Sequence, residues 1–281
     1  MSTSVAAAVL LAALLHAVWN ALIKGGTDRL AAMGWVSIGS GVAGMALLPF
    51  LPVPAWPAWP YIVASVFIHI AYRLFLVRAY AEGDMAQVYP LARGSGPLIV
   101  TVVGVGLLGE AMPLIELAGV LVLILGILAL AFRGGARALG RLFSPAALYA
   151  LATGVFIAGY TLVDGLGARL ALNATSYAAW MFALDWWLLA AIVVRRRGWS
   201  WLRPSPTVAL NLAGGLLSFA AYWIVIWAMA RAPIPAVAAL RETSILFGML
   251  LGLFFLGERL TPVRLFSGCA ILGGVVLMRL G

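Results

Sequence analysis

The sequence predicts an all-α integral membrane protein, in which ten transmembrane helices form two inverted five-helix repeats around a central cavity. Of the 281 residues, 64% are hydrophobic and only 10% are charged, whereas soluble domains are about 25% charged. The apolar residues fall into ten runs, each near the roughly 20 residues that a helix needs to cross a bilayer. The second half of the chain repeats the pattern of the first, and its basic residues change sides as an inverted repeat requires.

Turn residues, prolines or charges separate the ten apolar runs. The proline-rich break PFLPVPAWPAWP at 49–60 predicts a stiff connection with tryptophans at the membrane interface. The most polar break, RGGARALGRLFSP at 133–145, lies near the middle of the chain. We therefore expect a first repeat at 1–132, a basic linker at 133–144 and a second repeat at 145–281. The predicted spans are 3–23, 31–51, 60–80, 84–108, 113–132, 145–166, 175–194, 206–230, 235–256 and 262–280.

The duplication is visible as a constant offset between the halves. Residues of the fourth and fifth spans match residues of the ninth and tenth at a spacing of 148. One such match could be chance, but a constant offset over two helices and their connection indicates a repeated unit. The matched positions are Arg93 with Arg241, Gly104 with Gly252, Gly109-Glu110 with Gly257-Glu258, and Gly126 with Gly274.

The basic residues indicate the direction of insertion. In the first half they follow the first and third spans, and in the second half they follow the second and fourth spans of that half. This switch is expected when a five-helix unit is duplicated, because an odd number of spans inverts the second copy. One side then carries twelve basic residues, namely Lys24, Arg29, Arg78, Arg133, Arg137, Arg141, Arg195, Arg196, Arg197, Arg203, Arg259 and Arg264. The other side carries Arg169, Arg231 and Arg279. The positive-inside rule makes the richer side cytoplasmic, which predicts both termini outside.

Two spans carry prolines beside an arginine, and we expect these prolines to interrupt the helices. Such interrupted spans are typical of substrate sites in inverted-repeat transporters. The fourth span contains QVYPLARGSGP around Arg93, and the ninth contains PIPAVAALRETS ending near Arg241. An unpaired charge at this depth costs at least ~3 kcal/mol. Both arginines therefore either face an aqueous cavity and bind a substrate carboxylate or phosphate, or pair with a buried acid such as Glu242 or Asp185.

Aromatic and polar side chains share helix faces at the same depth. His16, Trp19 and Asn20 stand at i, i+3 and i+4 of the first span, and Tyr160 and Asp164 stand one turn apart in the sixth. We expect these residues to line a cavity, although aromatic side chains also pack helices together. The candidate cavity residues are Trp19, Asn20, His69, Tyr72, Tyr89, Arg93, Tyr160, Tyr222, Trp223, Arg241 and Glu242. The candidate residues for coupling to protons are Asp164, Asp185 and His16.

Other classes of protein lack support in the sequence. The net charge of +9 is distributed between apolar runs and not along one basic stripe, so no nucleic-acid partner is expected. One cysteine, Cys269, and two histidines cannot form a metal site on their own. The sequence contains no phosphate-binding loop and no catalytic motif, so we expect no catalytic residues, no cofactor and no enzyme activity.

Motifs at the ends of the spans carry a family resemblance. The fourth and ninth spans end in LLGE and FLGE, the spans after them are rich in glycine, and the first span ends in HAVWNALIKG. With these features the whole chain resembles the EamA-type ten-helix branch of the drug/metabolite transporter superfamily, and within it the YddG-type exporters of aromatic and other amino acids. The resemblance implies a central cavity lined by spans 1, 3, 4, 6, 8 and 9. It also implies cytoplasmic termini, whereas the charge count places them outside, and we follow the count.

The expected function is export of amino acids, aromatic and other amphipathic ones, across a bacterial inner (plasma) membrane by alternating access. The partners are then a small-molecule substrate and the lipid bilayer, and the protein is expected to work as a monomer. Within transport, a multidrug or sugar-phosphate carrier is the alternative, and a phosphate substrate would favour joint action of Arg93 and Arg241. A membrane enzyme would need an acid–base pair or metal cluster, and a scaffold would not need charges at the membrane midplane.

Overall fold

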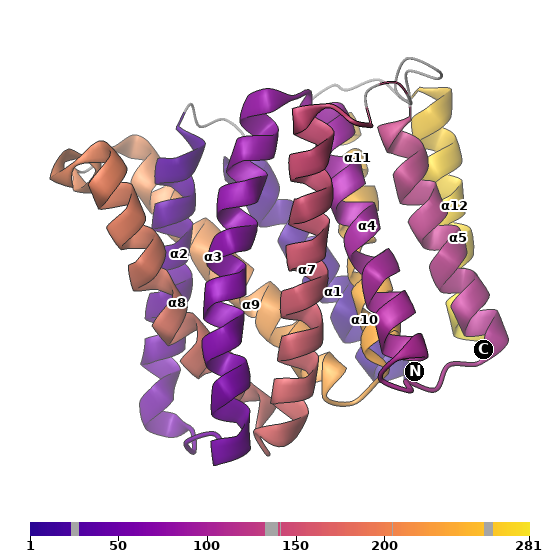
Figure 1. Ribbon diagram of the computed structural model, residues 1–281, viewed down its shortest axis with the longest axis horizontal. Helices are drawn as coiled ribbons and strands as arrows, with labels where there is room; N and C mark the ends of the chain where they lie inside the picture. The colour runs from indigo at the N-terminus through magenta and orange to yellow at the C-terminus, as the bar shows by residue number, and fades with distance from the viewer. Residues whose placement is uncertain (24–27, 133–139, 141, 204, 256–260) are drawn as a thin grey trace.

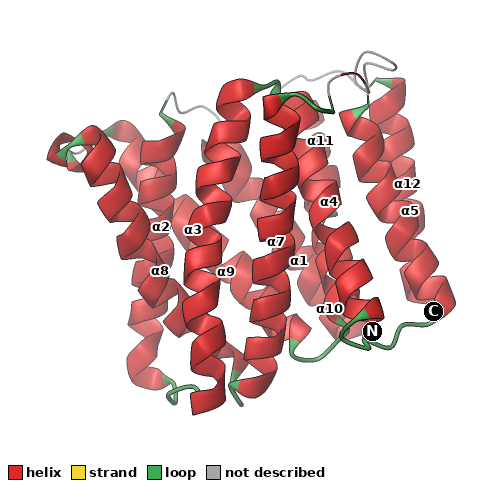
Figure 2. Ribbon diagram, viewed as in Figure 1, coloured by secondary structure: helices red, strands yellow, loops and turns green. Residues whose placement is uncertain are grey.

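A computed structural model gives the structure of the protein and describes all residues except 24–27, 133–139, 141, 204 and 256–260. The described residues contain ten helical spans that are long and apolar enough to cross a membrane, and no strands, as the sequence predicts (Figure 2). Nine spans are single helices and the ninth consists of two. In chain order the helices are α1 (Thr3–Ile23), α2 (Arg29–Leu47), α3 (Trp59–Glu82), α4 (Met85–Gly106), α5 (Leu114–Ala131), α7 (Pro145–Leu170), α8 (Ala174–Arg197), α9 (Pro206–Met229), α10 (Ile234–Arg241), α11 (Ser244–Phe255) and α12 (Pro262–Leu280).

Polar side chains begin several of the helices. The side chain of Asp28 accepts a hydrogen bond from the backbone N–H of Ala31 at the start of α2, and Ser144 does the same for Ala147 in α7. Asn173 begins α8 in this way. These residues satisfy backbone donors that have no partner within the helix. The predicted breaks therefore contain the polar residues that begin the next helices. The linker predicted at 133–144 lies largely outside the described residues.

The helices run roughly parallel and form one bundle, with α2 and α8 at one edge and α5 with α12 at the other (Figure 1). Both termini lie on the same face of the bundle, as an even number of spans requires. Below, this face is called the terminal face. The end of α1 and the start of α2, the end of α3 and the start of α4, and the start of α12 lie on the opposite face.

The packing pairs fit two inverted repeats. If α1–α5 correspond to α7–α12 in order, the contact between α1 and α9 corresponds to the contact between α3 and α7, and both are present. The contact of α2 with α9 corresponds in the same way to that of α3 with α8. Two further pairs, α2 with α8 and α5 with α12, each join an element to its own counterpart. A two-fold relation between the halves would produce this pattern.

The prolines of the fourth and ninth spans act differently from the sequence-based expectation that they interrupt the helices. Helix α4 runs continuously through Pro90 and Pro97. In the ninth span Pro235 stands in the first turn of α10, where a proline has no helical hydrogen bond to lose. The interruption falls later, at Glu242-Thr243, where the N–H of Thr243 bonds the carbonyl of Leu240. The break thus lies directly after Arg241 and beside the polar residues of the core.

Helices α2 and α9 cross so closely that the crossing requires glycine. A Cβ atom added to Gly39 would stand 2.5 Å from the backbone oxygen of Leu212, and the hydroxyl of Ser40 donates to the carbonyl of Gly215 at 3.0 Å. We expect Gly39→Ala to lower the free energy of unfolding by about 1–3 kcal/mol, because backbone must move to admit the methyl group. Thermal unfolding in detergent measures the change. Gly273→Ala is the control, since a Cβ at Gly273 meets nothing within 4 Å, and equal melting temperatures for the two variants would contradict the expectation.

Candidate functional site

A cavity of about 510 Å³ lies inside the bundle. Its mouth is marked by Arg29, Asp84 and Arg264, which lie at the connections on the face opposite the termini. From there the cavity extends inward to Arg93 on α4 and Ser244 at the start of α11. Cavities of 300–1,000 Å³ are typical of small-molecule sites. The cavity is therefore open to one face of the membrane and large enough for a metabolite. Below, it is called the outer cavity.

One wall of the outer cavity is the polar face of α1. His16, Trp19 and Asn20 all line it, as their helical spacing predicts. The indole N–H of Trp19 donates to Nδ1 of His16 at 3.3 Å, and the amide of Asn20 donates to the carbonyl of His16 at 2.7 Å. Tyr72 and Tyr89 also line this cavity, from α3 and α4. The wall therefore combines aromatic surface with amide and imidazole groups that can form hydrogen bonds.

A second, smaller cavity of about 80 Å³ adjoins the first. Five residues line both, namely His16, Trp19, Met33, Tyr72 and Arg93. The smaller cavity continues to His69, Tyr160, Tyr222 and Arg241. Below, it is called the inner cavity. Most of the aromatic and charged residues that the sequence singles out are thus brought together on two connected cavities.

The charged core of the site consists of two arginines and one glutamate. Nε of Arg93 lies 2.6 Å from Oε2 of Glu242, and Nη2 of Arg93 donates to the hydroxyl of Ser244 at 2.9 Å. Arg241 is more loosely held, with its closest nitrogen 3.4 Å from Oε1 of Glu242. All three charged side chains are at most 5% exposed. Both arginines thus pair with Glu242 and also line a cavity. Two cations on one anion leave an excess positive charge.

Aromatic rings surround the guanidinium of Arg241. Its Cζ atom lies 5.8 Å from the ring centre of Tyr160 and 5.9 Å from that of Tyr222. His69 stacks on Tyr160 with centroids 4.2 Å apart, and Tyr72 meets Tyr160 edge-on at 5.5 Å. A contact between a cation and the face of an aromatic ring contributes about 0.5–2 kcal/mol. Arg241 therefore has the rings of Tyr160 and Tyr222 as partners in addition to the carboxylate of Glu242.

Asp164 differs from the other buried acids of the core. Its two oxygens accept hydrogen bonds from the hydroxyls of Tyr177, at 2.9 Å, and Tyr222, at 2.6 Å. In the described part of the chain it forms no salt bridge within 4.0 Å. Tyr222 connects the acid to the inner cavity, which its own ring lines. Asp164 is thus a carboxylate held by neutral donors directly behind the cavity wall.

Asp185 pairs with an arginine that sequence analysis does not single out. Nη1 of Arg73 lies 2.6 Å from Oδ2 of Asp185, and this ion pair joins α3 to α8. Arg73 also lines the inner cavity. The sequence does contain a signal, since Arg73 follows His69 at i+4 and shares its helix face. Sequence reasoning also misses Ser244 and Tyr177, which bond Arg93 and Asp164, because single hydroxyl residues are common in spans and form no pattern.

Two predicted cavity residues lie elsewhere. The indole of Trp223 donates to the hydroxyl of Thr175 at 3.0 Å and stacks on Phe219, and Trp223 is not among the residues lining either cavity. Glu242 is fully buried beneath the two arginines and does not line a cavity surface itself. Its role in the site is to hold Arg93 and Arg241. Within the described residues, no group of three His, Cys, Asp or Glu side chains could hold a metal ion.

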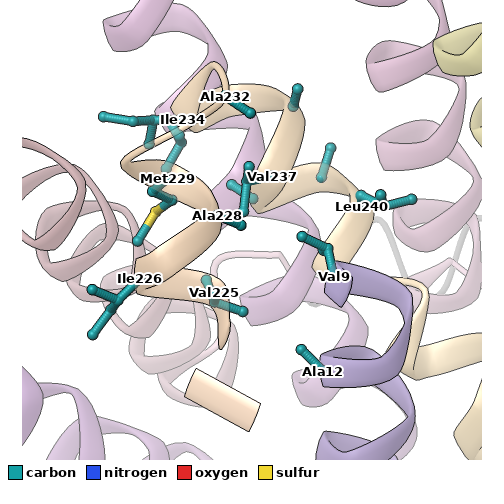
Figure 3. Packing of buried hydrophobic residues seen from close by; sticks show 14 of the residues in the cluster. Val9, Ala12, Val225, Ile226, Ala228, Met229, Ala232, Ile234, Val237 and Leu240 are labelled. Atoms are coloured by element: carbon teal, nitrogen blue, oxygen red, sulfur yellow. The ribbon is translucent and has the colours of Figure 1, made fainter. Parts of the chain in front are cut away.

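The terminal face of the bundle is closed below the inner cavity. Side chains of α1, α9 and α10 pack there into a dry cluster that includes Val9, Met229, Ile234, Val237 and Leu240 (Figure 3). All of these side chains are at most 1% exposed. Solvent that enters from the opposite face therefore meets an apolar barrier before it reaches the terminal face.

One arginine ties the segments around this barrier together. Arg169, near the end of α7, lies 2.5 Å from Glu110 of the α4–α5 connection. It also donates to the backbone oxygens of Met229 at 3.0 Å and Ala232 at 3.1 Å. Gly109, before the glutamate, has a φ of 67°, which favours glycine and sets the turn that presents Glu110. The matching Gly257-Glu258 lies outside the described residues.

A ten-helix membrane bundle with a charged cavity open to one face has the architecture of a transporter. The profile of the EamA-like transporter family matches residues 3–132 and again residues 144–280. The chain belongs to the EamA-like transporter family, and hence to the drug/metabolite transporter superfamily of multi-pass membrane proteins. The double match fits the predicted duplication.

Comparison with solved structures supports the same fold. A protein of known crystal structure superposes with a TM-score of 0.77 over 100% of this chain and 99% of that chain, at 19% sequence identity. At this identity the likeness shows the fold alone. No curated protein matches the sequence.

Proposed function

We propose that the protein exports amino acids, aromatic and other amphipathic ones, across a bacterial inner membrane by alternating access. The observation that carries the proposal is the excess positive charge of Arg93 and Arg241 over Glu242, since Arg93 lines both cavities and Arg241 lines the inner cavity. A carboxylate would complete this charge balance, and the guanidinium geometry suits it. The loosely held Arg241 is the stronger candidate for the contact, because Arg93 is already committed to Glu242 and Ser244.

The rest of the cavity supports an amphipathic substrate. Rings of Trp19, Tyr72 and Tyr89 share the outer cavity with aliphatic side chains from α5, α7 and α11. An apolar cavity of about 150 Å³ is enough for a benzene-sized ring. A cavity of about 510 Å³ therefore has room for an aromatic side chain together with an amino-acid backbone.

The sidedness of the proposal rests on the basic residues. The outer cavity opens on the face that carries Arg29, Arg78, Arg195, Arg203 and Arg264. By the positive-inside rule this face is cytoplasmic and the terminal face is external. The conformation is then inward-open, ready to load substrate from the cytoplasm. Export would continue when the barrier on the terminal face opens and the cytoplasmic face closes.

Among the three candidate coupling residues, Asp164 fits the role better than Asp185 or His16. Protonation of Asp185 would leave Arg73 without its carboxylate in the core. Protonation of Asp164 would break no ion pair among the described residues, because its oxygens accept hydrogen bonds from tyrosine hydroxyls. Nδ1 of His16 accepts the indole N–H of Trp19 and belongs to the cavity wall. If transport is coupled to protons, we expect Asp164 to carry the proton.

Exchange in proteoliposomes tests the proposal. Vesicles that contain the purified protein and a high internal concentration of unlabelled phenylalanine are expected to accumulate labelled phenylalanine transiently and saturably from outside. Parallel vesicles are loaded with inorganic phosphate and with a sugar phosphate, and all are assayed with and without a pH gradient. Exchange of the phosphate compounds without exchange of amino acids would replace the proposal with the sugar-phosphate carrier. A gradient effect that disappears in Asp164→Asn would assign coupling to that residue.

A further inference from the structure

The wall of the outer cavity is indented at Gly248, in the middle of α11. Gly248 lines the cavity, and a Cβ atom added to it would meet no heavy atom within 4 Å. The nearest turns of the same helix also face the cavity, through Ser244 and Gly252. Gly248 is exposed, whereas a position inside a bundle is normally covered by side chains, because interiors are close-packed. Here the space belongs to the cavity.

This indentation lies close to the charged end of the site. Ser244, one turn before Gly248 on the same helix, accepts the hydrogen bond from Nη2 of Arg93 at 2.9 Å. A substrate whose carboxylate is held by the arginines would therefore have the remainder of its structure one helical turn away, about 6 Å. That spacing matches the distance from the carboxylate of an amino acid to the middle of its side chain.

Part of the wall of the cavity that Gly248 lines is apolar. Leu130 of α5, Ile157 of α7, and Ile245 with Met249 of α11 line the same cavity. Apart from Ser244, the polar and aromatic residues of the cavity, such as His16 and Asn20, come from other helices. An unpaired polar group placed against such a wall would lose its hydrogen bonds to water, whereas an apolar group would gain by burial.

We propose that the wall around Gly248 is the subsite for the apolar side chain of the substrate, and that the absence of a side chain at position 248 sets the largest substrate that the protein accepts. The inference rests on the proposed function, because it places the carboxylate of an amino acid at the arginine cluster. The subsite takes aromatic and long aliphatic groups. Small amino acids bind without filling it.

A graded series of substitutions tests the subsite. Gly248→Ala, Gly248→Val and Gly248→Leu each fill more of the indentation, and the free space around the Cβ position allows each of them to fold. Exchange of labelled phenylalanine and of labelled alanine is measured for each variant in proteoliposomes. One methylene group in an apolar site changes discrimination by about 10- to 200-fold. We expect Gly248→Leu to lower phenylalanine exchange about tenfold or more relative to alanine exchange, with the smaller residues in between.

Gly273→Leu is the matched control. Gly273 is also a glycine within a span whose Cβ would meet nothing within 4 Å, but it lies on α12 and does not line either cavity. The same substitution there is expected to leave the ratio of phenylalanine to alanine exchange unchanged. Thermal unfolding of both leucine variants shows whether they fold equally well.

The outcomes separate the subsite from the proposed function. A phenylalanine-to-alanine ratio that stays constant from glycine to leucine at position 248 would overturn the subsite while leaving amino-acid transport in place. A ratio that falls equally in Gly273→Leu would also overturn it. Absence of any amino-acid exchange by the unmodified protein would overturn the proposed function and the subsite together.

Discussion

Arg241→Gln is expected to lower amino-acid exchange about 10- to 150-fold while leaving the protein folded. A hydrogen bond to a charged group contributes about 1.5–3 kcal/mol, and each 1.4 kcal/mol is a factor of ten. Removal of this arginine leaves Arg93 and Glu242 as a close pair at 2.6 Å, so the cluster of these residues becomes neutral. The ion pair that disappears, between Arg241 and Glu242, is the longer one, at 3.4 Å. The substitution therefore removes the free positive charge more than it removes structure.

Two further variants isolate the reason for this decrease. Arg241→Lys keeps the charge but not the two parallel donors of a guanidinium, and we expect it to recover only part of the exchange. Arg78→Gln is the matched control, because Arg78 pairs with Glu82 at an exposed position and does not line either cavity. Melting temperatures in detergent are compared for all three. Normal exchange by Arg241→Gln would remove this residue from the substrate site.

Arg169→Gln is expected to open the terminal face. In the described conformation Arg169 holds Glu110 and the carbonyls of Met229 and Ala232 around the apolar barrier. We expect these bonds to break when the barrier opens, so their removal should favour the conformation that is open to the terminal face. A change of about 2 kcal/mol would shift the two populations about 30-fold. Transport rates alone would not reveal this shift, whereas accessibility would.

Thiol labelling from the side of the terminal face measures the shift. The chain has one cysteine, Cys269, and the test uses Cys269→Ser with Val9→Cys, since Val9 is fully buried in the barrier. A membrane-impermeant maleimide should label the new thiol faster when Arg169→Gln is added. The control is Arg231→Gln, an exposed arginine on the same face that donates to the carbonyl of Trp227, one turn before it. Equal labelling rates in the two variants would show that Arg169 does not hold the barrier closed.

Periodicity and composition are sufficient to predict the ten spans and the faces of the helices, because apolar length and i, i+4 spacing depend on local sequence. Partners across the bundle cannot be predicted in this way. The sequence offers both Glu242 and Asp185 as partners for Arg93, whereas in the structure Asp185 pairs with Arg73, which lies far from it along the chain. A helix face shows where a side chain points but not which helix packs against it.

Two neighbouring aromatic residues show the same limit of prediction from sequence. The sequence-based prediction has both Tyr222 and Trp223 lining the cavity, yet successive residues on a helix point about 100° apart. The structure directs Tyr222 to the inner cavity and Trp223 to Thr175 of α8.

The sequence also favours a break at the prolines of the ninth span, because proline is the strongest local signal. In the structure the break falls at Glu242-Thr243, beside the arginines that this glutamate holds.

The ion pairs of the core have a consequence for how the chain is made. Arg73 with Asp185, Arg93 with Glu242 and Glu110 with Arg169 each join a residue before the central linker to a residue after it. During synthesis the first five spans enter the bilayer before their partners exist. Arg73 and Arg93 must then remain hydrated, near lipid head groups or in a water-filled groove, until α8 and the α10–α11 turn arrive. Insertion of this protein is therefore completed by the pairing of charges across its two halves. Carboxylates of the second half, Asp185 and Glu242, neutralise the arginines of the first.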